Sequence, residues 1–319
     1  MPKVSVIIPV YNVAEYIERC LLTLFGQTLR DMEYIFVDDG SLDDSVAKIG
    51  EVVERFPDFR KTQVKILRHN RNRGVAAARA TGIQAATGDY VIHCDPDDYV
   101  ETDMYEKMYQ KAIADHADIV ACHYFEEWPH HTKTIRRNYA QTPQDCLENI
   151  YRRNCHCSRL WDKLIRRSLI EQYDIIPCEG CDYAEDLDCI VRVLYHASSI
   201  SVVALPLYHY CRREDSITRS LKDRKVWDMR KRVMDRICAF LNREPRYRTA
   251  CHQMQFYAKM ECRAAFDGDE YQWFHTYRGS HGAILRYNDM PLKVRIMWWI
   301  VLQHYAIFRM AKKWFPTFR

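Results

Sequence analysis

The fold of this chain is decided between residues 64 and 95, which read VKILRHNRNRGVAAARATGIQAATGDYVIHCD. The residues 64–70 carry the β-branched and apolar side chains of a strand. A helical pattern follows over 74–86, and the residues 90–95 again have the pattern of a strand. A strand, a helix and a second strand in direct succession predict two parallel strands that are joined by a crossover helix.

The residues before this stretch repeat the same alternation. Apolar strands are predicted over 4–10 and 33–39, and a helical pattern follows each of them. The first 95 residues therefore predict an α/β domain with a mainly parallel sheet. The chain then becomes mixed, with strand patterns at 118–125 and 132–139 and helical patterns at 102–115, 144–152 and 185–196.

From residue 219 onward the pattern is almost entirely helical, and we place a domain boundary there. The 319 residues are 48% hydrophobic, which suffices for a packed α/β domain over 1–218 and a helical region over 219–319. The helical region is strongly basic, with 21 Lys and Arg against 9 Asp and Glu, whereas the first 218 residues carry 26 against 34. Anionic membrane surfaces and nucleic acids are the usual partners of such a region.

Two further features indicate the cell compartment. Thirteen cysteines are scattered through predicted helices and strands, which is typical of a reduced cytosolic protein rather than a disulfide scaffold. The amino-terminal residues MPKVSVIIPV lack the features of a signal peptide, so we expect no leader. The protein is therefore predicted to be cytoplasmic.

Acidic residues gather where the predicted strands end. Asp38 and Asp39 follow one strand, and Asp95, Asp97 and Asp98 follow another. Because ligands of α/β domains lie beyond the carboxyl ends of the parallel strands, these side chains are expected to face one crevice. Carboxylates suit hard divalent cations, which take oxygen ligands. A solvated loop with acidic helix caps is the alternative interpretation.

Three blocks of the sequence, taken together, resemble the inverting family-2 glycosyltransferases with a GT-A type fold, of the bacterial surface-polysaccharide type. They are VSVIIPVYN at 4–12, VDDGSLDDS at 37–45 and RNRGVAAARATGIQAATGDYVIHCDPDD at 71–98. The resemblance continues less sharply to about residue 220. It implies a Rossmann-like, nucleotide-sugar-binding domain, with its nucleotide and metal half at about 1–100 and its acceptor half at about 101–218.

The resemblance also implies which residues bind the donor. Pro9 and Tyr11 match the positions that frame the nucleotide base, with the tyrosine ring against uracil. Asp39, with Asp38 beside it, matches the aspartate that hydrogen-bonds the base edge. Arg79 matches a basic residue near the diphosphate, although the residue after it differs from the Asn that is frequent in the family.

Three aspartates match the reaction centre of the family. Asp95 and Asp97 match its Asp-x-Asp motif, the first toward the ribose and the second as a ligand of Mn²⁺ or Mg²⁺. A metal on the diphosphate makes the nucleotide a better leaving group, because it neutralises the developing charge. Asp186 matches the catalytic base, which takes the proton of the acceptor hydroxyl on the opposite face. Asp186 also stands at the start of a helical pattern, where a helix N-cap is its alternative role.

Several other residues are weaker candidates for the site. Trp161 and Lys163 could line the acceptor pocket, and a core tryptophan with a surface lysine is the alternative. The segment YHYCRREDSIT at 208–218 is predicted to be flexible and to contact the diphosphate. Its candidate residues are His209, Arg212, Arg213 and Ser216.

The basic carboxyl-terminal segment, 291–319, contains a mostly apolar stretch from Ile296 to Phe308. This stretch is shorter than the ~20 apolar residues that a membrane-spanning helix needs. Flanking basic residues and tryptophans are typical of a helix that lies in the headgroup plane. A core helix is the alternative. Nucleic acid is not an expected partner, because no DNA-binding motif accompanies the charge.

The sequence thus predicts a metal-dependent, hexosyltransferase-like enzyme that takes a sugar from a nucleotide-diphosphate sugar, with UDP-sugars favoured. We expect a polysaccharide or lipid-linked glycan as its acceptor and the inner membrane face as its location. Transfer of one sugar is favoured, because this sequence lacks the Gln-x-x-Arg-Trp motif and the membrane spans of processive synthases. Two alternatives remain open. One is a sugar-nucleotide nucleotidyltransferase, which releases pyrophosphate, and the other is a non-catalytic nucleotide-sugar-binding scaffold.

Overall fold

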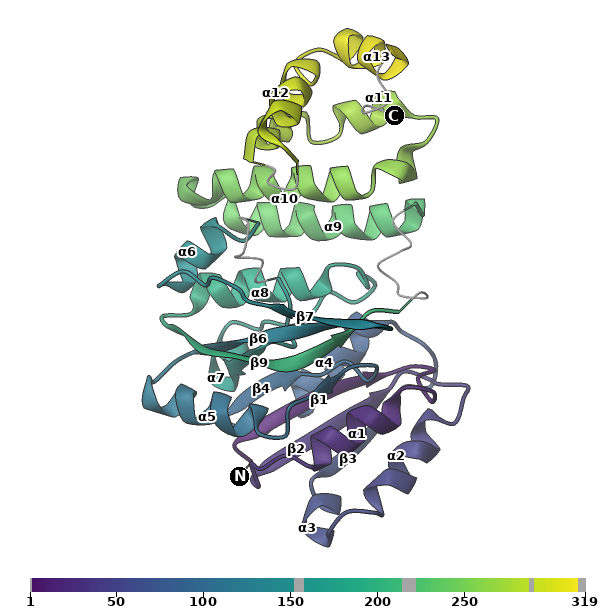
Figure 1. The fold of residues 1–319 in the computed structure, drawn as a ribbon, viewed down its shortest axis with the longest axis vertical. Helices are drawn as coiled ribbons and strands as arrows, with labels where there is room; N and C mark the ends of the chain where they lie inside the picture. Colours follow the sequence, from purple (N-terminus) through teal and green to yellow (C-terminus); the bar gives the residue numbers. More distant parts are fainter. Residues whose placement is uncertain (1, 152–157, 214–221, 287–289, 315–319) are drawn as a thin grey trace. The chain divides into compact units, whose positions relative to one another are not determined.

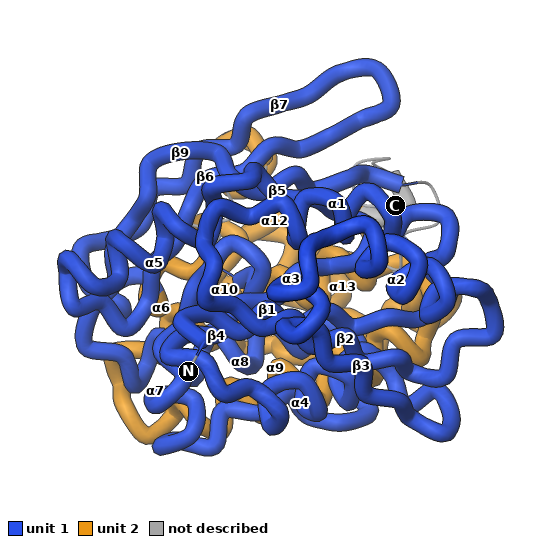
Figure 2. Tube along the Cα trace, turned by 90° about the horizontal axis from the view of Figure 1, so that it is seen from below, with its two compact units in different colours: residues 1–146, 157–214 blue, residues 147–156, 215–319 orange. Residues whose placement is uncertain are grey.

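The computed structural model describes residues 2–151, 158–213, 222–286 and 290–314. The chain divides into two compact units, coloured blue and orange in Figure 2. Unit 1 comprises residues 1–146 and 157–214, and unit 2 comprises residues 147–156 and 215–319. The predicted boundary between residues 218 and 219 lies outside the described residues.

The first half of unit 1 alternates strands and helices as predicted (Figure 1). Its elements are β1 (Val4–Val10), α1 (Ile17–Phe25), β2 (Met32–Asp38), α2 (Ser45–Val53), α3 (Asp58–Lys61), β3 (Val64–Arg68), α4 (Val75–Ala85) and β4 (Tyr90–His93). The strands lie in the order β3-β2-β1-β4, and each neighbouring pair in this run is parallel. The predicted α/β class with a mainly parallel sheet is therefore confirmed.

The central strand β1 is buried on both of its faces. Val6 and Ile8 belong to a core that includes Leu21 of α1, whereas Ile7 lies against Gly82 of α4. A Cβ on Gly82 would overlap with the Ile7 side chain, so the glycine permits the close approach of helix and strand. A strand that is covered on both faces requires the continuous apolar run that β1 provides.

The second half of unit 1 continues the same sheet with mixed pairing. Its elements are β5 (Tyr99–Val100), α5 (Met104–Ala114), β6 (Ile119–Trp128), β7 (His131–Ile135), α6 (Pro143–Glu148), β8 (Lys163–Arg166), α7 (Arg167–Gln172), α8 (Glu185–His196) and β9 (Ile200–Cys211). The strand order continues from β4 as β8-β6-β9-β5, and β7 pairs with β6. β8 is antiparallel to β4 and β6, whereas β6 and β9 are parallel.

The sequence pattern does not predict β8 or β9. Residues 208–211, which we expected to be flexible, belong to β9 and pair with β6, so that expectation is wrong for them. Pro206 interrupts the strand pattern of the sequence, because proline lacks the backbone N–H that donates a hydrogen bond between strands. It lies opposite His123, where the register of the β6–β9 pair shifts. Residues 214–218 of the same segment lie outside the described residues.

Unit 2 is helical, as predicted. Its elements are α9 (Arg224–Leu241), η2 (Pro245–Tyr247), α10 (Arg248–Glu261), η3 (Arg263–Phe266), α11 (Glu270–His275), η4 (Arg278–Arg286), α12 (Leu292–Val301) and α13 (Tyr305–Trp314). Its core contains three buried tryptophans, Trp227, Trp273 and Trp298. Lys259 is buried in the same unit, where its Nζ donates hydrogen bonds to two backbone carbonyls.

The carboxyl-terminal segment forms two helices rather than the single helix that the sequence predicts. α12 ends at Val301 and α13 begins at Tyr305. The rings of Trp298 and Phe308 are buried, with centroids 6.3 and 5.2 Å from that of Trp273. One side of this segment is therefore part of the core of unit 2. Among the described residues, no helix has both the length and the apolar character to cross a bilayer.

The first turn of α4 depends on Gly74, whose φ is +94°. A Cβ at this position would overlap with the carboxylate of Asp182, which accepts a hydrogen bond of 3.1 Å from the amide of Ala76. The loop that precedes α8 is thus packed directly against the start of α4.

We expect Gly74→Ala to lower the free energy of unfolding by about 1–3 kcal/mol, because a side chain at this φ is strained. The overlap with Asp182 adds to that cost. In an Asp182→Ala background the overlap disappears, so the cost of Gly74→Ala should shrink without vanishing. Urea denaturation of the wild type, both single variants and the double variant measures the two costs. Equal costs in the two backgrounds would show that Asp182 does not restrict this turn.

Candidate active site

Arg79 lies at the centre of the candidate site. It projects from α4 into the interior, where it donates hydrogen bonds to Asp95, at 2.9 Å, and to Glu185. Burial alone would lower the pKa of Arg79, but the charges of Glu185 and Asp95 outweigh it and raise the pKa. The guanidinium therefore stays charged and ties the end of β4 to the start of α8.

The three aspartates after β4 have different surroundings. Asp98 is only 1% exposed and accepts hydrogen bonds from the Tyr208 hydroxyl, at 2.7 Å, and from the Cys211 amide, at 2.8 Å. Asp98 thus fastens the loop after β4 to β9. The side chains of Asp95 and Asp97 are 25% and 21% exposed and remain accessible to a ligand.

Asp97 forms an ion pair with Arg213, with 2.5 Å between Oδ2 and Nη2. Burial raises the pKa of Asp97, the charge of Asp95 raises it further, and Arg213 opposes the shift. The residues that the structure describes contain no group of three or more His, Cys, Asp or Glu side chains that could hold a metal alone. Mg²⁺ commonly uses one or two carboxylates and takes its other ligands from phosphate and water. The oxygens of Asp95 and Asp97 fit a cation of that kind.

The two aspartates at the end of β2 form hydrogen bonds and ion pairs with neighbouring residues of unit 1. Asp39 accepts hydrogen bonds from the amides of Gly74, at 2.7 Å, and Arg73, at 2.9 Å, and its carboxylate contacts His69 Nδ1 at 2.6 Å. Asp38 pairs with Arg68 at 3.1 Å. Asp39 therefore organises the turn between β3 and α4.

The other two predicted base-binding residues lie at the end of β1. Pro9 is buried within the strand, where it pairs with Val37. Tyr11 follows the strand directly and is 42% exposed, so its ring is accessible to a planar ligand.

Asp186 lies in the first turn of α8, next to Glu185. The N-cap position is taken by Ala184, whose φ is +68°, so the alternative role of Asp186 as N-cap is wrong. The carboxylate of Asp186 accepts a hydrogen bond of 2.8 Å from the Leu187 amide. Burial raises the pKa of Asp186, and Arg79 opposes the shift. The residue itself is partly exposed, and a carboxylate with a raised pKa is a stronger base than one with the ordinary value.

The structure places two of the weaker candidates in the core. Trp161 is buried and stacks on Tyr208 with 4.3 Å between ring centroids. Lys163 is fully buried and pairs with Asp162 at 2.5 Å, so the alternative of a surface lysine is wrong. The partner Asp162 directly precedes Lys163 in the sequence, but the burial of this pair depends on tertiary packing, which the sequence pattern does not show.

The candidates of the segment 208–218 differ in their contacts. His209 lies between Glu127, at 2.7 Å, and Glu101, at 3.0 Å. Arg212 pairs with Glu126, and Arg213 pairs with Asp97. Ser216 lies outside the described residues.

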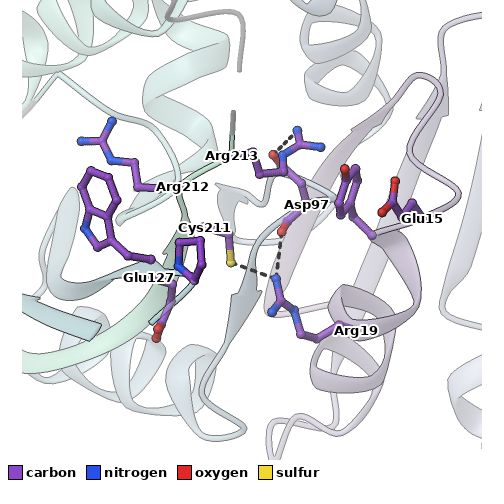
Figure 3. A pocket seen from close by; sticks show the side chains of 10 residues that line it. Glu15, Arg19, Asp97, Glu127, Cys211, Arg212 and Arg213 are labelled. Atoms are coloured by element: carbon purple, nitrogen blue, oxygen red, sulfur yellow. Dashed lines mark hydrogen bonds and ion pairs between the residues drawn. The ribbon is translucent and has the colours of Figure 1, made fainter. Parts of the chain in front are cut away.

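A cavity of about 440 Å³ opens beside Asp97 (Figure 3). Arg19 of α1 lines it and donates hydrogen bonds to the backbone oxygen of Asp97, at 3.3 Å, and to Cys211 Sγ, at 2.9 Å. Tyr16 and Trp128 supply aromatic walls. Sequence reasoning did not select these residues. The spacing of α1 places Arg19 away from its apolar side, but no local signal tells which strand end it will face.

Comparison with known proteins identifies the fold family. The family model described as "Glycosyl transferase family 2" matches residues 5–173, which is more than half of the chain. The chain belongs to this family. The match includes the predicted donor residues and the Asp95–Asp97 pair, and it ends before Asp186.

Two relatives from Bacillus subtilis strain 168 support the same membership. "Putative glycosyltransferase EpsH" is 36% identical over 215 residues, which cover 66% of this chain and 60% of the relative. "Uncharacterized glycosyltransferase EpsJ" is 32% identical over 231 residues, which cover 68% of this chain and 63% of the relative. The chain thus matches less than two thirds of the length of these relatives.

Solved structures show the same fold. The structure of Staphylococcus aureus TarS 1–349 in complex with UDP-GlcNAc has a TM-score of 0.67 and 17% identity, covering 97% of this chain and 92% of TarS. The mannosyltransferase PcManGT from Pyrobaculum calidifontis, in complex with GDP-Man and Mn²⁺, has a TM-score of 0.57 and 16% identity, covering 99% and 88%. The predicted GT-A type fold of this family-2 chain is confirmed.

The Glu185 carboxyl predicts a dependence of stability on pH. Burial raises its pKa from 4.5 to about 7, although Arg79 opposes the shift. The folded protein therefore holds this proton more tightly than the unfolded chain does. The stabilisation from this group is complete below pH 4.5 and is lost as the pH rises through about 7.

In Glu185→Gln this group cannot titrate, so the free energy of unfolding should fall less between pH 4.5 and about 7 than in the wild type. Urea denaturation across this range measures the difference. Glu171→Gln, at a side chain that is 58% exposed, is the matched control and should follow the wild type. The same pH profile in Glu185→Gln and the wild type would contradict a Glu185 pKa that is higher in the folded protein than in the unfolded chain.

Proposed function

We propose that this protein transfers one sugar, with inversion, from a nucleotide-diphosphate sugar to a hydroxyl group of a polysaccharide or lipid-linked glycan. The observation that carries the proposal is that Arg79 joins the carboxylate of Asp95 to the start of α8, where Asp186 lies, within a family-2 fold. A UDP-sugar is the favoured donor. In support, TarS is described in complex with UDP-GlcNAc.

The nucleotide would lie at the carboxyl ends of β1 and β2. The exposed ring of Tyr11, with Pro9 beside it, would stack on the base. Asp39 and Asp38 would contact the base edge, and the amides of Arg73 and Gly74 would fix the orientation of Asp39.

Asp97 would hold the divalent cation, and Asp95, which pairs with Arg79, would lie toward the ribose. Mn²⁺ or Mg²⁺ bound there would neutralise the charge that develops on the leaving diphosphate. In support, PcManGT is described in complex with GDP-Man and Mn²⁺. Arg79 keeps Asp95 in place next to the cation site, whereas the carboxylate of Asp97 pairs with Arg213.

Asp186 would act as the general base. Its carboxylate would take the proton of the acceptor hydroxyl as that oxygen bonds to C1 of the sugar. The bond between C1 and the diphosphate oxygen would break, and the nucleoside diphosphate would leave with the electron pair. Attack from the face opposite the leaving group inverts the configuration at C1.

The cation role of Asp97 predicts a loss of binding. Asp97→Ala should abolish turnover and the strengthening of UDP binding by Mn²⁺, because the cation loses its ligand. Isothermal titration calorimetry measures UDP binding with and without Mn²⁺. Asp58→Ala, at a side chain that is 98% exposed, is the matched control. Unchanged Mn²⁺-dependent binding in Asp97→Ala would remove Asp97 from the cation site.

The base role of Asp186 predicts a loss of chemistry without a loss of binding. Asp186→Asn is nearly isosteric but cannot accept the proton, so transfer should fall by ~10²-fold or more while donor binding persists. Transfer is followed by release of nucleoside diphosphate from a panel of nucleotide sugars with glycan acceptors. Release of pyrophosphate would instead indicate a nucleotidyltransferase. Near-wild-type transfer by Asp186→Asn would place the base elsewhere, with Glu185 and Asp188 as the next candidates.

We infer that unit 2 attaches the protein to the cytoplasmic face of the membrane through α12. Four of its large apolar side chains share one helical face and are 39% to 58% exposed, namely Leu292, Ile296, Trp299 and Ile300. The surrounding sequence is strongly basic, which complements anionic headgroups. Trp298 and Phe308 take no part in this face, because they are buried.

The double substitution Ile296→Ser and Trp299→Ser should reduce flotation of the protein with anionic vesicles. Both side chains are exposed, so the stability of the fold should change little. High salt should weaken binding of the wild type in part, because it screens charge but leaves apolar burial intact. Ile113→Ser, at an exposed position in unit 1, is the matched control. Flotation of the double variant equal to the wild type would remove α12 from the membrane contact.

A further inference from the structure

The ion pair between Arg213 and Asp97 occupies the carboxylate that the proposed function assigns to the cation. Arg213 lies just after β9, and its guanidinium is 4.2 Å from the centre of the Tyr16 ring. Figure 3 shows Arg213 directed at Asp97, whereas Arg212 is directed to the other side of the cavity. Arg212 pairs with Glu126 and lies 5.5 Å from the Trp128 ring. The two neighbouring arginines therefore have separate partners.

A guanidinium and a divalent cation compete for the same carboxylate. Arg213 Nη2 is 2.5 Å from Asp97 Oδ2, so a cation at this oxygen would lie close to another positive charge. Like charges at such a distance disfavour each other, above all where the side chains are mostly buried. A cation can use Asp97 fully only when Arg213 has another partner. The donor diphosphate is a suitable one, because a guanidinium binds phosphate oxygens through two parallel hydrogen bonds.

We propose that Arg213 neutralises Asp97 in the absence of donor and transfers to the diphosphate when the cation binds, so that cation and donor bind cooperatively. This inference rests on the proposed role of Asp97 in cation binding. The Tyr16 ring keeps the guanidinium beside the cavity in either arrangement, because an aromatic face attracts the guanidinium whether its partner is a carboxylate or a phosphate. Arg19 holds the backbone oxygen of Asp97, so the exchange of partners involves side chains and leaves the loop in place.

The consequence is a coupling free energy between two ligands of one site. Each ligand must strengthen the binding of the other by the same factor, which for coupled sites is typically ~5- to 150-fold. UDP itself ligates Mn²⁺, so part of this coupling persists in any variant. The affinity for Mn²⁺ in the absence of nucleotide isolates the contribution of Arg213, because only the competition for Asp97 affects it.

The test is calorimetric titration of Mn²⁺ into the full chain, with and without UDP, for the wild type, Arg213→Gln and the control Arg55→Gln. Arg213→Gln should bind Mn²⁺ alone several-fold more tightly than the wild type does. The factor by which UDP strengthens Mn²⁺ binding should be several-fold smaller in this variant. Arg55→Gln should match the wild type in both values, because Arg55 pairs with Glu18 and does not line the cavity.

The failure of this inference is distinguishable from the failure of the proposed function. If Asp97→Asn abolishes Mn²⁺ binding but Arg213→Gln binds Mn²⁺ alone no more tightly than the wild type, Asp97 holds the cation and the competition by Arg213 is overturned. If Asp97→Asn binds Mn²⁺ as the wild type does, the cation site itself is overturned, and this inference with it. Urea denaturation confirms that each variant is folded before titration. Arg213→Lys, which keeps the charge, should bind Mn²⁺ alone as weakly as the wild type does.

Discussion

The guanidinium of Arg79 is the constraint on which the candidate site depends. A buried charge is stable only when it is paired and hydrogen-bonded, and Arg79 meets this condition through Asp95 and Glu185. Glu185 is 106 residues away in the sequence, so the pair joins two distant segments of unit 1. Removing one partner of a buried pair typically costs about 3–5 kcal/mol. The loop after β4 and the first turn of α8 are therefore fixed relative to each other.

The other polar contacts of the site differ in how easily a ligand could exchange them. Asp98 is buried between the Tyr208 hydroxyl and the Cys211 amide, and Asp39 accepts hydrogen bonds from two amides, so the orientation of both carboxylates is fixed. Asp97 is different, because its side chain is 21% exposed and its partner is a side chain at the wall of a cavity. A fixed framework with one exchangeable pair is what binding of a charged donor requires, since the framework keeps its geometry while the pair changes partners.

The parts of the fold that the sequence predicts are those that local pattern controls. β1 is a continuous apolar run because helices cover both of its faces, and such a run is visible in the residues themselves. β9 depends instead on pairing with β6 across a register shift at Pro206, and no local pattern reveals a partner so far away. The carboxyl-terminal helix breaks after Val301 because Leu302 and Phe308 both turn into the core of unit 2, which the run of apolar letters does not show.

The residues of the candidate site likewise divide into those that the sequence predicts and those that only the structure reveals. The resemblance of the sequence to family-2 enzymes selects Asp95, Asp97 and Asp186, because these positions stand in recognisable blocks. It does not reveal that Glu185 is the partner of Arg79, that Lys163 is buried against Asp162, or that Arg213 reaches Asp97. The contacts of Arg79 and Arg213 join segments that are distant in the sequence, and the burial of the adjacent Asp162 and Lys163 depends on what packs around them, so tertiary packing decides all three.

The central claim is that a divalent cation binds at Asp97, in the loop after β4 that Arg79 fixes through Asp95. The most direct measurement is the broadening of arginine side-chain NMR signals by paramagnetic Mn²⁺ in the presence of UDP, with Mg²⁺ as the diamagnetic reference. Arg60 is a suitable internal control. It is buried in α3, directly before β3 begins, and so lies near the amino ends of the parallel strands rather than near their carboxyl ends. The account predicts that Mn²⁺ broadens the Arg79 signal far more strongly than the Arg60 signal. Equal broadening of the two signals, or stronger broadening of Arg60, would contradict it.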